Sequence, residues 1–218
     1  MVVAEMQFRY ELEKDYYARA WPIHALPYRH LEPYLRSWLL KPSELFDQKT
    51  VVDIGAGEAT YTRLIGDIFT PKVVLACELF TERMLPAARA NQNPNVLFVT
   101  GNVFQLPIKE SSVDNVFGSL VLHQLPDLAR VVGEVSRVLR IGGYYVGIEP
   151  NPCNPVIFYR YVRGSHSRNQ YLLTEGHLRR AFEPGGFSVS VRYFFARRPA
   201  LRGRLLGTCM GILARKNA

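Results

Sequence analysis

The sequence has few cysteines, no long apolar run and almost no acidic residues in its last quarter. Its three cysteines, Cys77, Cys153 and Cys209, form neither a CxxC pair nor an even disulfide set, which argues against a disulfide framework and a zinc site. No apolar run reaches the roughly 18 residues that a transmembrane helix needs, and Met1–Tyr10 lacks the apolar segment of a signal peptide. These absences predict a cytoplasmic protein without a bound metal.

The shortage of acidic residues is confined to the C-terminal region. Residues 160–218 contain 12 Lys and Arg against Glu175 and Glu183 only, a net charge of +10, whereas residues 1–159 contain 15 basic and 17 acidic residues, a net charge of −2. A basic region of this kind suits an anionic membrane surface, nucleic acid or an anionic substrate. A solvated basic surface without a partner is the alternative.

What the sequence does have is enough apolar residues, 48% of the chain, for a buried core. Apolar runs rich in Val and Ile alternate with segments of helical periodicity. The clearest helix, Leu128–Leu139, has its apolar residues on one face, and Gly142-Gly143 is expected to end it. This alternation predicts an α/β fold, a Rossmann-like doubly wound sheet that is mostly parallel. The expected parallel strands are Thr50–Ile54, Val73–Glu78, Val96–Thr100, one within Val113–Leu122, and Tyr144–Glu149.

The C-terminal part is expected to form an antiparallel hairpin. Phe187–Ala196 and Gly207–Ala214 are expected to be strands, and residues 197–206 between them are too few for a crossover helix. The hairpin would bring the sheet to seven strands in a single domain, 1–218. We expect an N-terminal helical cover rich in Tyr, Trp and Pro (1–45), a cofactor-binding core (46–150), an acceptor-site loop (151–173) and a C-terminal helix with the hairpin (174–218).

The most informative motif follows the first expected strand. Gly55 and Gly57 let a ligand approach the backbone closely, and open α/β sheets bind ligands beyond the carboxyl ends of their strands. The dinucleotide pattern G-x-G-x-x-G requires a third glycine where this chain has Thr60, and Glu58 would stand close to a pyrophosphate. Such a turn disfavours phosphates and tolerates a cationic sulfonium nucleoside. A tight turn without a ligand is the alternative.

From this turn onward the sequence resembles class I S-adenosylmethionine-dependent methyltransferases, closest to the group typified by ubiquinone-biosynthesis enzymes. The similar segments are Asp53–Gly57, Glu78, Gly101–Val103, Asp114–His123 and Arg137–Gly143. The resemblance implies S-adenosylmethionine as cofactor and methyl transfer to a small or lipid-like acceptor. A nucleic-acid or protein methyltransferase that uses the basic region, and a non-catalytic cofactor-binding protein, remain alternatives. Asn102 departs from the family, which usually has aspartate there.

The resemblance also implies roles for individual residues. It places the ribose hydroxyls on Glu78, the methionine part on Gly55, Ala56 and Gly57, and the ligand's ammonium near Asp53. It places the adenine edge on the Asn102 side chain and the Val103 N–H, with Leu79 against a ring face, and the methionine amine near the backbone of Ser119 and Leu120.

Methyl transfer by in-line displacement requires the protein mainly to position the acceptor and exclude water. A general base is needed only if the acceptor loses a proton. His123, after the fourth strand, is the first candidate and Glu149, at the end of the fifth, is the second; a histidine that only closes a turn is the alternative. Tyr17 and Trp21 are candidates for an aromatic cover over an apolar acceptor, together with Tyr161, Tyr171 and other aromatic residues of the loop 151–173. His166 in that loop is a substrate-binding candidate and a third candidate base.

Overall fold

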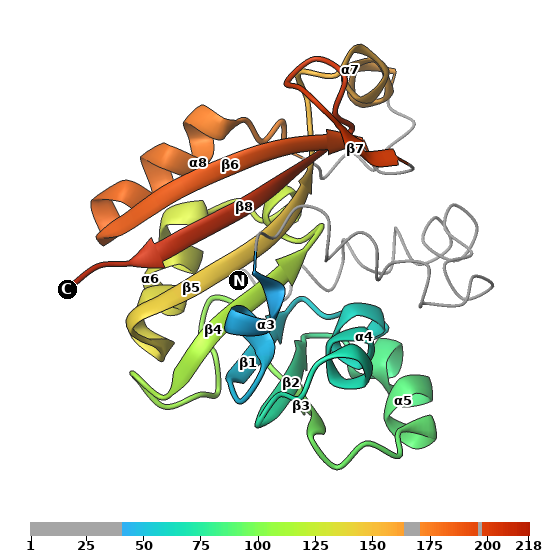
Figure 1. Ribbon diagram of the computed structural model, residues 1–218, viewed down its shortest axis with the longest axis vertical. Coiled ribbons are helices and arrows are strands. Elements are labelled where there is room, and N and C mark those ends of the chain that lie inside the picture. The colour runs from blue at the N-terminus through green and yellow to red at the C-terminus, as the bar shows by residue number, and fades with distance from the viewer. Residues whose placement is uncertain (1–40, 164–170, 196–197) are drawn as a thin grey trace.

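A mixed sheet runs through the centre of the molecule (Figure 1). The computed structural model describes residues 41–163, 171–195 and 198–218, and for residues 198–202 it describes the backbone only. The strand order is β3-β2-β1-β4-β5-β8-β6-β7. Tyr17, Trp21, His166 and nearly all of the expected N-terminal cover lie outside the described residues. The strands are β1 Thr50–Ile54, β2 Val73–Glu78, β3 Val96–Thr100, β4 Val113–Ser119, β5 Leu139–Pro150, β6 Phe187–Phe195, β7 Arg198–Arg202 and β8 Cys209–Lys216.

All seven expected strands form, and the predicted fold class is confirmed. Strands β3, β2, β1, β4 and β5 are parallel, and β8 pairs antiparallel with both β5 and β6. One addition is the short edge strand β7, which pairs with β6 inside the segment expected to be a plain connection. The chain lays β2 and β3 to one side of β1 and then returns to place β4 on its other side. The crevice between the ends of β1 and β4 is therefore the topological switch point, where such sheets bind ligands.

Helices cover both faces of the sheet (Figure 1). On one face, Leu64 and Ile65 of α4 pack in one core cluster with Phe117 and Val146 of the sheet. On the other, α6 packs with α8 against a second cluster that contains Tyr145. The helices are α3 Pro42–Phe46, α4 Thr60–Ile68, α5 Thr81–Ala90, α6 Leu128–Val138, α7 Pro155–Val162 and α8 Glu175–Phe182, with 3-10 turns η3 Leu122–Gln124 and η4 Glu183–Gly185.

The end of α6 differs from the expectation. The helix stops at Val138 and β5 begins at Leu139, so Gly142-Gly143 lie inside the strand and do not end the helix. The pairing of β4 with β5 shifts register between Val113 and Asn115, which leaves the segment around these glycines bulged. A Cβ on Gly143 would lie 2.4 Å from the Asp114 carbonyl oxygen. Gly143 is needed for this close approach of two backbones, and Gly142 for its φ of +80°.

Candidate active site

Glu78 joins the ends of the first two strands. Its Oε2 accepts the Gly57 N–H at 2.8 Å and its Oε1 accepts the Phe80 N–H at 3.1 Å. The guanidinium of Arg83 on α5 lies 3.8 Å from the same carboxylate, which is buried. A carboxylate held by two N–H groups beside a glycine turn is pre-oriented, and its remaining lone pairs suit a diol.

The glycine turn after β1 is a tightly packed, left-handed segment. Gly55 has φ +63° and Gly57 has φ +57°. A Cβ on Gly55 would lie 2.4 Å from Val121 Cγ2, and one on Gly57 would lie 2.9 Å from a guanidinium nitrogen of Arg83. Glycine is therefore favoured at both positions by the backbone conformation, and at Gly55 also by the close approach of Val121. Ala56 donates its N–H to the Cys77 carbonyl at 3.2 Å, so that N–H already bonds the adjacent strand end.

Asp53, two residues before the turn, faces α4. Thr62 donates its hydroxyl hydrogen to Asp53 Oδ2 at 2.6 Å, and both side chains are buried. Burial raises the pKa of Asp53 to about 7, assisted by the nearby charge of Glu78 and opposed by the bond from Thr62. The sequence identified Asp53 but not Thr62, whose position one turn into the helix gave no distinguishing signal.

Asn102 lies after β3 with its side chain already engaged. Its Oδ1 accepts the Phe104 N–H at 2.9 Å, and its backbone carbonyl accepts the Gln105 N–H at 2.9 Å. Val103 beside it is buried, and Leu79 after β2 is half-buried. Asn102 therefore stabilises its own turn, as Asn commonly does, and an adenine amino group would have to share the amide oxygen with Phe104.

Ser119 is the last residue of β4, and Leu120 follows it. Leu120 has φ +56°, a conformation that non-glycine residues rarely adopt. Its N–H donates to the Ile148 carbonyl at 2.8 Å, and its carbonyl accepts from Gln124 Nε2 at 2.8 Å. The Leu120 backbone is thus fixed by neighbours, and Gln124 is a supporting residue that the sequence pattern did not indicate.

His123 and Glu149 form one buried unit. The distance from His123 Nδ1 to Glu149 Oε2 is 2.5 Å, and Glu149 Oε1 accepts the N–H groups of Val121 at 3.1 Å and Leu122 at 2.7 Å. A carboxylate only accepts, so Nδ1 carries the proton and Nε2 is the ring nitrogen with a lone pair. The sequence proposed these residues as separate bases, whereas the structure makes Glu149 the partner that orients His123.

The segment expected to be an acceptor-site loop contains helix α7. Tyr161 on this helix has a raised pKa because it is partly buried and feels the charge of Glu149. Beyond the helix, Tyr171 donates its N–H to the His123 carbonyl at 2.7 Å. Aromatic residues of this segment therefore do lie beside the His123–Glu149 pair.

Tyr145 is a further buried group that the sequence did not indicate. Its hydroxyl makes no hydrogen bond to any residue that the structure describes. Burial raises the pKa of this hydroxyl well above its usual value, and the charges of Glu149 and Asp53 add to the effect. A Cβ on Gly118 would lie 2.7 Å from the hydroxyl oxygen, so Gly118 makes room for it beneath the site.

Within the described ranges, no group of three or more His, Cys, Asp or Glu residues is placed to hold a metal ion. No disulfide joins Cys77, Cys153 and Cys209. Nor does any described helix have the length and apolar character to cross a membrane.

Comparison with known proteins finds similarity to methyltransferases. A family model described as a methyltransferase domain matches residues 52–147. A probable S-adenosylmethionine-dependent methyltransferase of Mycolicibacterium smegmatis is 30% identical over 151 residues, which cover 65% of this chain and 52% of the relative. A demethylmenaquinone methyltransferase of Geobacillus stearothermophilus is 28% identical over 134 residues, covering 60% of this chain and 56% of the relative. The chain thus spans about half the length of these curated relatives.

Solved structures agree on the fold. An S-adenosylmethionine-dependent methyltransferase from Thermotoga maritima, described as a possible histamine N-methyltransferase, superposes with a TM-score of 0.73 at 19% identity, covering 96% of this chain and 99% of that one. A methyltransferase from Mesorhizobium loti gives a TM-score of 0.69 at 20% identity, covering 85% and 97%. At these identities the likeness concerns the fold. The domain match over residues 52–147, the relatives and the fold agree with the glycine turn and Glu78, and they support assignment of this part of the chain to the class I S-adenosylmethionine-dependent methyltransferases.

Proposed function

We propose that this protein transfers the methyl group of S-adenosylmethionine to a small, lipid-like acceptor. The observation that carries the proposal is the link between Glu78 and Gly57, which sets a buried carboxylate beside a left-handed glycine turn at the switch point of the sheet. This arrangement fits a nucleoside that carries a diol and no phosphate.

The residues present fit the cofactor with three adjustments to the expected roles. Glu78 would bind the ribose hydroxyls with the lone pairs left by Gly57 and Phe80, and the turn from Gly55 to Gly57 would lie along the methionine part. Asp53 would act on the ligand's ammonium mainly as a nearby charge, because its Oδ2 is bonded to Thr62. Asn102 would contact adenine with an oxygen that already accepts from Phe104, supported by Val103 and Leu79. The Ser119 carbonyl suits the amine better than the Leu120 backbone, whose N–H and carbonyl are both bonded.

When bound, the sulfonium supplies an activated methyl group, so the protein's main tasks are to align the acceptor and exclude water. His123 is suited to remove a proton from an acceptor hydroxyl or acidic C–H. Glu149 holds the Nδ1–H and stabilises the imidazolium that would form, and it is therefore a positioning residue. Its other oxygen fixes Val121 and Leu122, which keeps η3 and His123 in place.

Two observations support a lipid-like acceptor. Two aromatic residues, Tyr161 of α7 and Tyr171 in the segment after it, lie beside the His123–Glu149 pair. Several relatives of 28–30% identity are demethylmenaquinone methyltransferases. Tyr17, Trp21 and His166 stay predictions as substrate-binding residues. Because lipid-like acceptors reside in membranes, the proposal includes peripheral contact with an anionic membrane surface.

Isothermal titration calorimetry with S-adenosylmethionine and its demethylated product, and with NAD as control, tests the cofactor. We expect micromolar binding of the first two and none of NAD. The acceptor is then tested by following methyl transfer to demethylmenaquinone in detergent, with an unrelated RNA and a histone mixture in parallel. Transfer to RNA or protein alone would replace the lipid-like acceptor, and cofactor binding without any transfer would favour a non-catalytic role.

A further inference from the structure

Helix α7 exposes apolar side chains to solvent, and none of its residues is buried. Val156 is 61% exposed, Phe158 47%, Tyr159 56% and Val162 68%. A surface helix of a soluble domain normally turns its apolar stripe to the core and its polar residues outward. In α7 the outward face is the apolar one, while the half-buried Ile157 and Tyr161 face the protein.

A second segment extends this surface. Leu205 and Leu206, between β7 and β8, are 67% and 66% exposed. They lie next to α7, and Figure 1 shows this loop beside the helix at one extremity of the molecule. We call the surface formed by both segments the apolar tip; it comprises Val156, Phe158, Tyr159, Val162, Leu205 and Leu206.

Two buried asparagines fix the apolar tip. Asn151 donates from Nδ2 to the carbonyls of Arg204 at 2.7 Å and Gly207 at 2.6 Å. Asn154 donates from Nδ2 to the carbonyls of Leu205 at 3.2 Å and Leu206 at 3.0 Å. The Asn154 Oδ1 also accepts the first N–H groups of α7 and caps the helix. The two leucines are therefore held outward by a buried hydrogen-bond network, although their own side chains pack against little.

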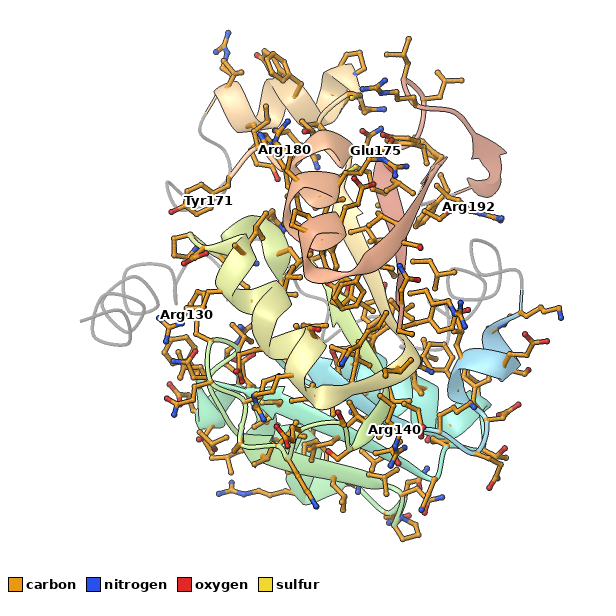
Figure 2. All side chains as sticks on the ribbon, turned by 90° about the vertical axis from the view of Figure 1, so that its left-hand side faces the viewer. Arg130, Arg140, Tyr171, Glu175, Arg180 and Arg192 are labelled. Atoms are coloured by element: carbon orange, nitrogen blue, oxygen red, sulfur yellow. The ribbon has the colours of Figure 1, made fainter. Side chains whose placement is uncertain are left out.

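Basic residues surround the apolar side chains. Arg160 lies on α7, Arg163 follows its last residue and Arg204 lies in the loop; all three are exposed. The Arg163 guanidinium stands 5.3 Å from the centre of the Tyr159 ring. Figure 2 shows Arg180 and Arg192 toward the same end of the molecule, whereas Arg140 lies toward the opposite end. The region after residue 159 carries a net charge of +10. Apolar and aromatic residues interspersed with arginine are typical of elements that lie in the interface of an anionic membrane.

We propose that the apolar tip docks the protein on an anionic lipid bilayer, with Leu205, Leu206 and the outer face of α7 in the headgroup region. The charges favour this occupant over a second copy of the chain, because self-association through the tip would bring Arg160, Arg163 and Arg204 of two molecules together. The inference rests on the proposed function, since the acceptor would be drawn from the same bilayer.

Docking through α7 would bring the bilayer close to the proposed acceptor site, because α7 lies near the His123–Glu149 pair. Its inner residue Tyr161 feels the charge of Glu149, and Tyr171 beyond it bonds the backbone of His123. Tyr171 and Leu172 are themselves 42% and 40% exposed. The bilayer would therefore meet the protein beside the proposed acceptor site, and an apolar acceptor would have a short way to travel.

Co-sedimentation with vesicles tests the proposal. The full-length protein is mixed at low salt with vesicles of phosphatidylcholine alone, or of phosphatidylcholine with phosphatidylglycerol, and the bound fraction is measured before and after adding salt. We expect binding to the anionic vesicles only, with release at high salt. The double variant Leu205→Ser/Leu206→Ser and the helix variant Val156→Ser/Val162→Ser should each lower the partition coefficient by roughly tenfold or more, because they remove apolar surface that would enter the bilayer.

The matched control is Ile141→Ser, which removes an equally exposed apolar side chain (69%) from the edge of the sheet opposite the strand ends; its partition should equal that of the wild type. Calorimetry with S-adenosylmethionine on the same proteins should give unchanged affinity, which separates loss of docking from loss of the cofactor site. Failure of the wild type to bind anionic vesicles, or wild-type binding by both double variants, would overturn the proposal. So would sedimentation equilibrium that shows a dimer of the wild type and monomers of both double variants.

Discussion

The carboxylate of Glu78 accepts the backbone N–H of Gly57 at 2.8 Å, across 21 residues of sequence. One buried side chain thereby holds the glycine turn of β1 against the end of β2. The residue that is expected to bind the ribose also shapes the turn that is expected to hold the methionine part. Substitution of Glu78 should therefore affect ligand affinity and stability together.

Glu78→Ala should weaken S-adenosylmethionine binding more than about tenfold and lower the free energy of unfolding by about 1–3 kcal/mol, because it leaves the Gly57 N–H buried without a partner. Calorimetry measures the first effect and urea unfolding the second. Glu110→Ala, at an exposed position, is the control and should change neither. An unchanged affinity in Glu78→Ala would remove Glu78 from the cofactor site.

Asp53 should make the protein less stable as the pH rises. Its pKa is raised from 3.8 to about 7 in the folded chain, so between these values the folded state binds a proton that the unfolded state has lost. The free energy of unfolding should then fall between about pH 4 and pH 7, by an amount on the order of 4 kcal/mol from this residue, and level off above pH 7.

Urea unfolding at a series of pH values measures this dependence. Asp53→Asn, which cannot ionise, should remove the decline and be the more stable protein at pH 8, whereas Asp67→Asn, on a surface-exposed position of α4, should retain it. Parallel curves for wild type and Asp53→Asn would contradict the raised pKa.

His123→Gln should reduce methyl transfer about 10²–10⁴-fold if the acceptor must lose a proton, with S-adenosylmethionine affinity unchanged. Glu149→Gln leaves one acceptor oxygen, which can serve either the His123 Nδ1–H or the N–H groups of Val121 and Leu122, and it removes the charge that would stabilise the imidazolium. It should therefore move the pH dependence of kcat/KM as well as its magnitude. The pH profiles of the two variants and the wild type provide the measurement. An unaltered rate in His123→Gln would assign the histidine a purely structural role.

Tyr145→Phe should leave stability unchanged or raise it by about 1 kcal/mol. The hydroxyl is buried and has no hydrogen-bond partner among the described residues, so its removal abolishes a desolvation cost without breaking a bond. The ring still packs on Phe182, with the two centroids 5.1 Å apart. Thermal unfolding compares the two proteins. A loss of more than about 1 kcal/mol would indicate a bound water or another partner for the hydroxyl.

The sequence alone determined the features that depend on residues close together along the chain. Buried strands such as Val73–Glu78 are marked by continuous apolar runs, and the apolar stripe of α6 has the helical period. Gly55 and Gly57 are recognisable because few other residues adopt the backbone that such a turn requires. Alternation of these elements was sufficient for the doubly wound sheet, since βαβ units have one hand.

Only the tertiary structure decided which distant residues meet. His123 and Glu149 stand 26 residues apart and pair because β4 and β5 are adjacent in the sheet. Asn151 binds carbonyls 53 and 56 residues away because β8 returns beside β5. No local periodicity encodes such contacts, because they depend on strand order and register, which arise when the whole sheet assembles.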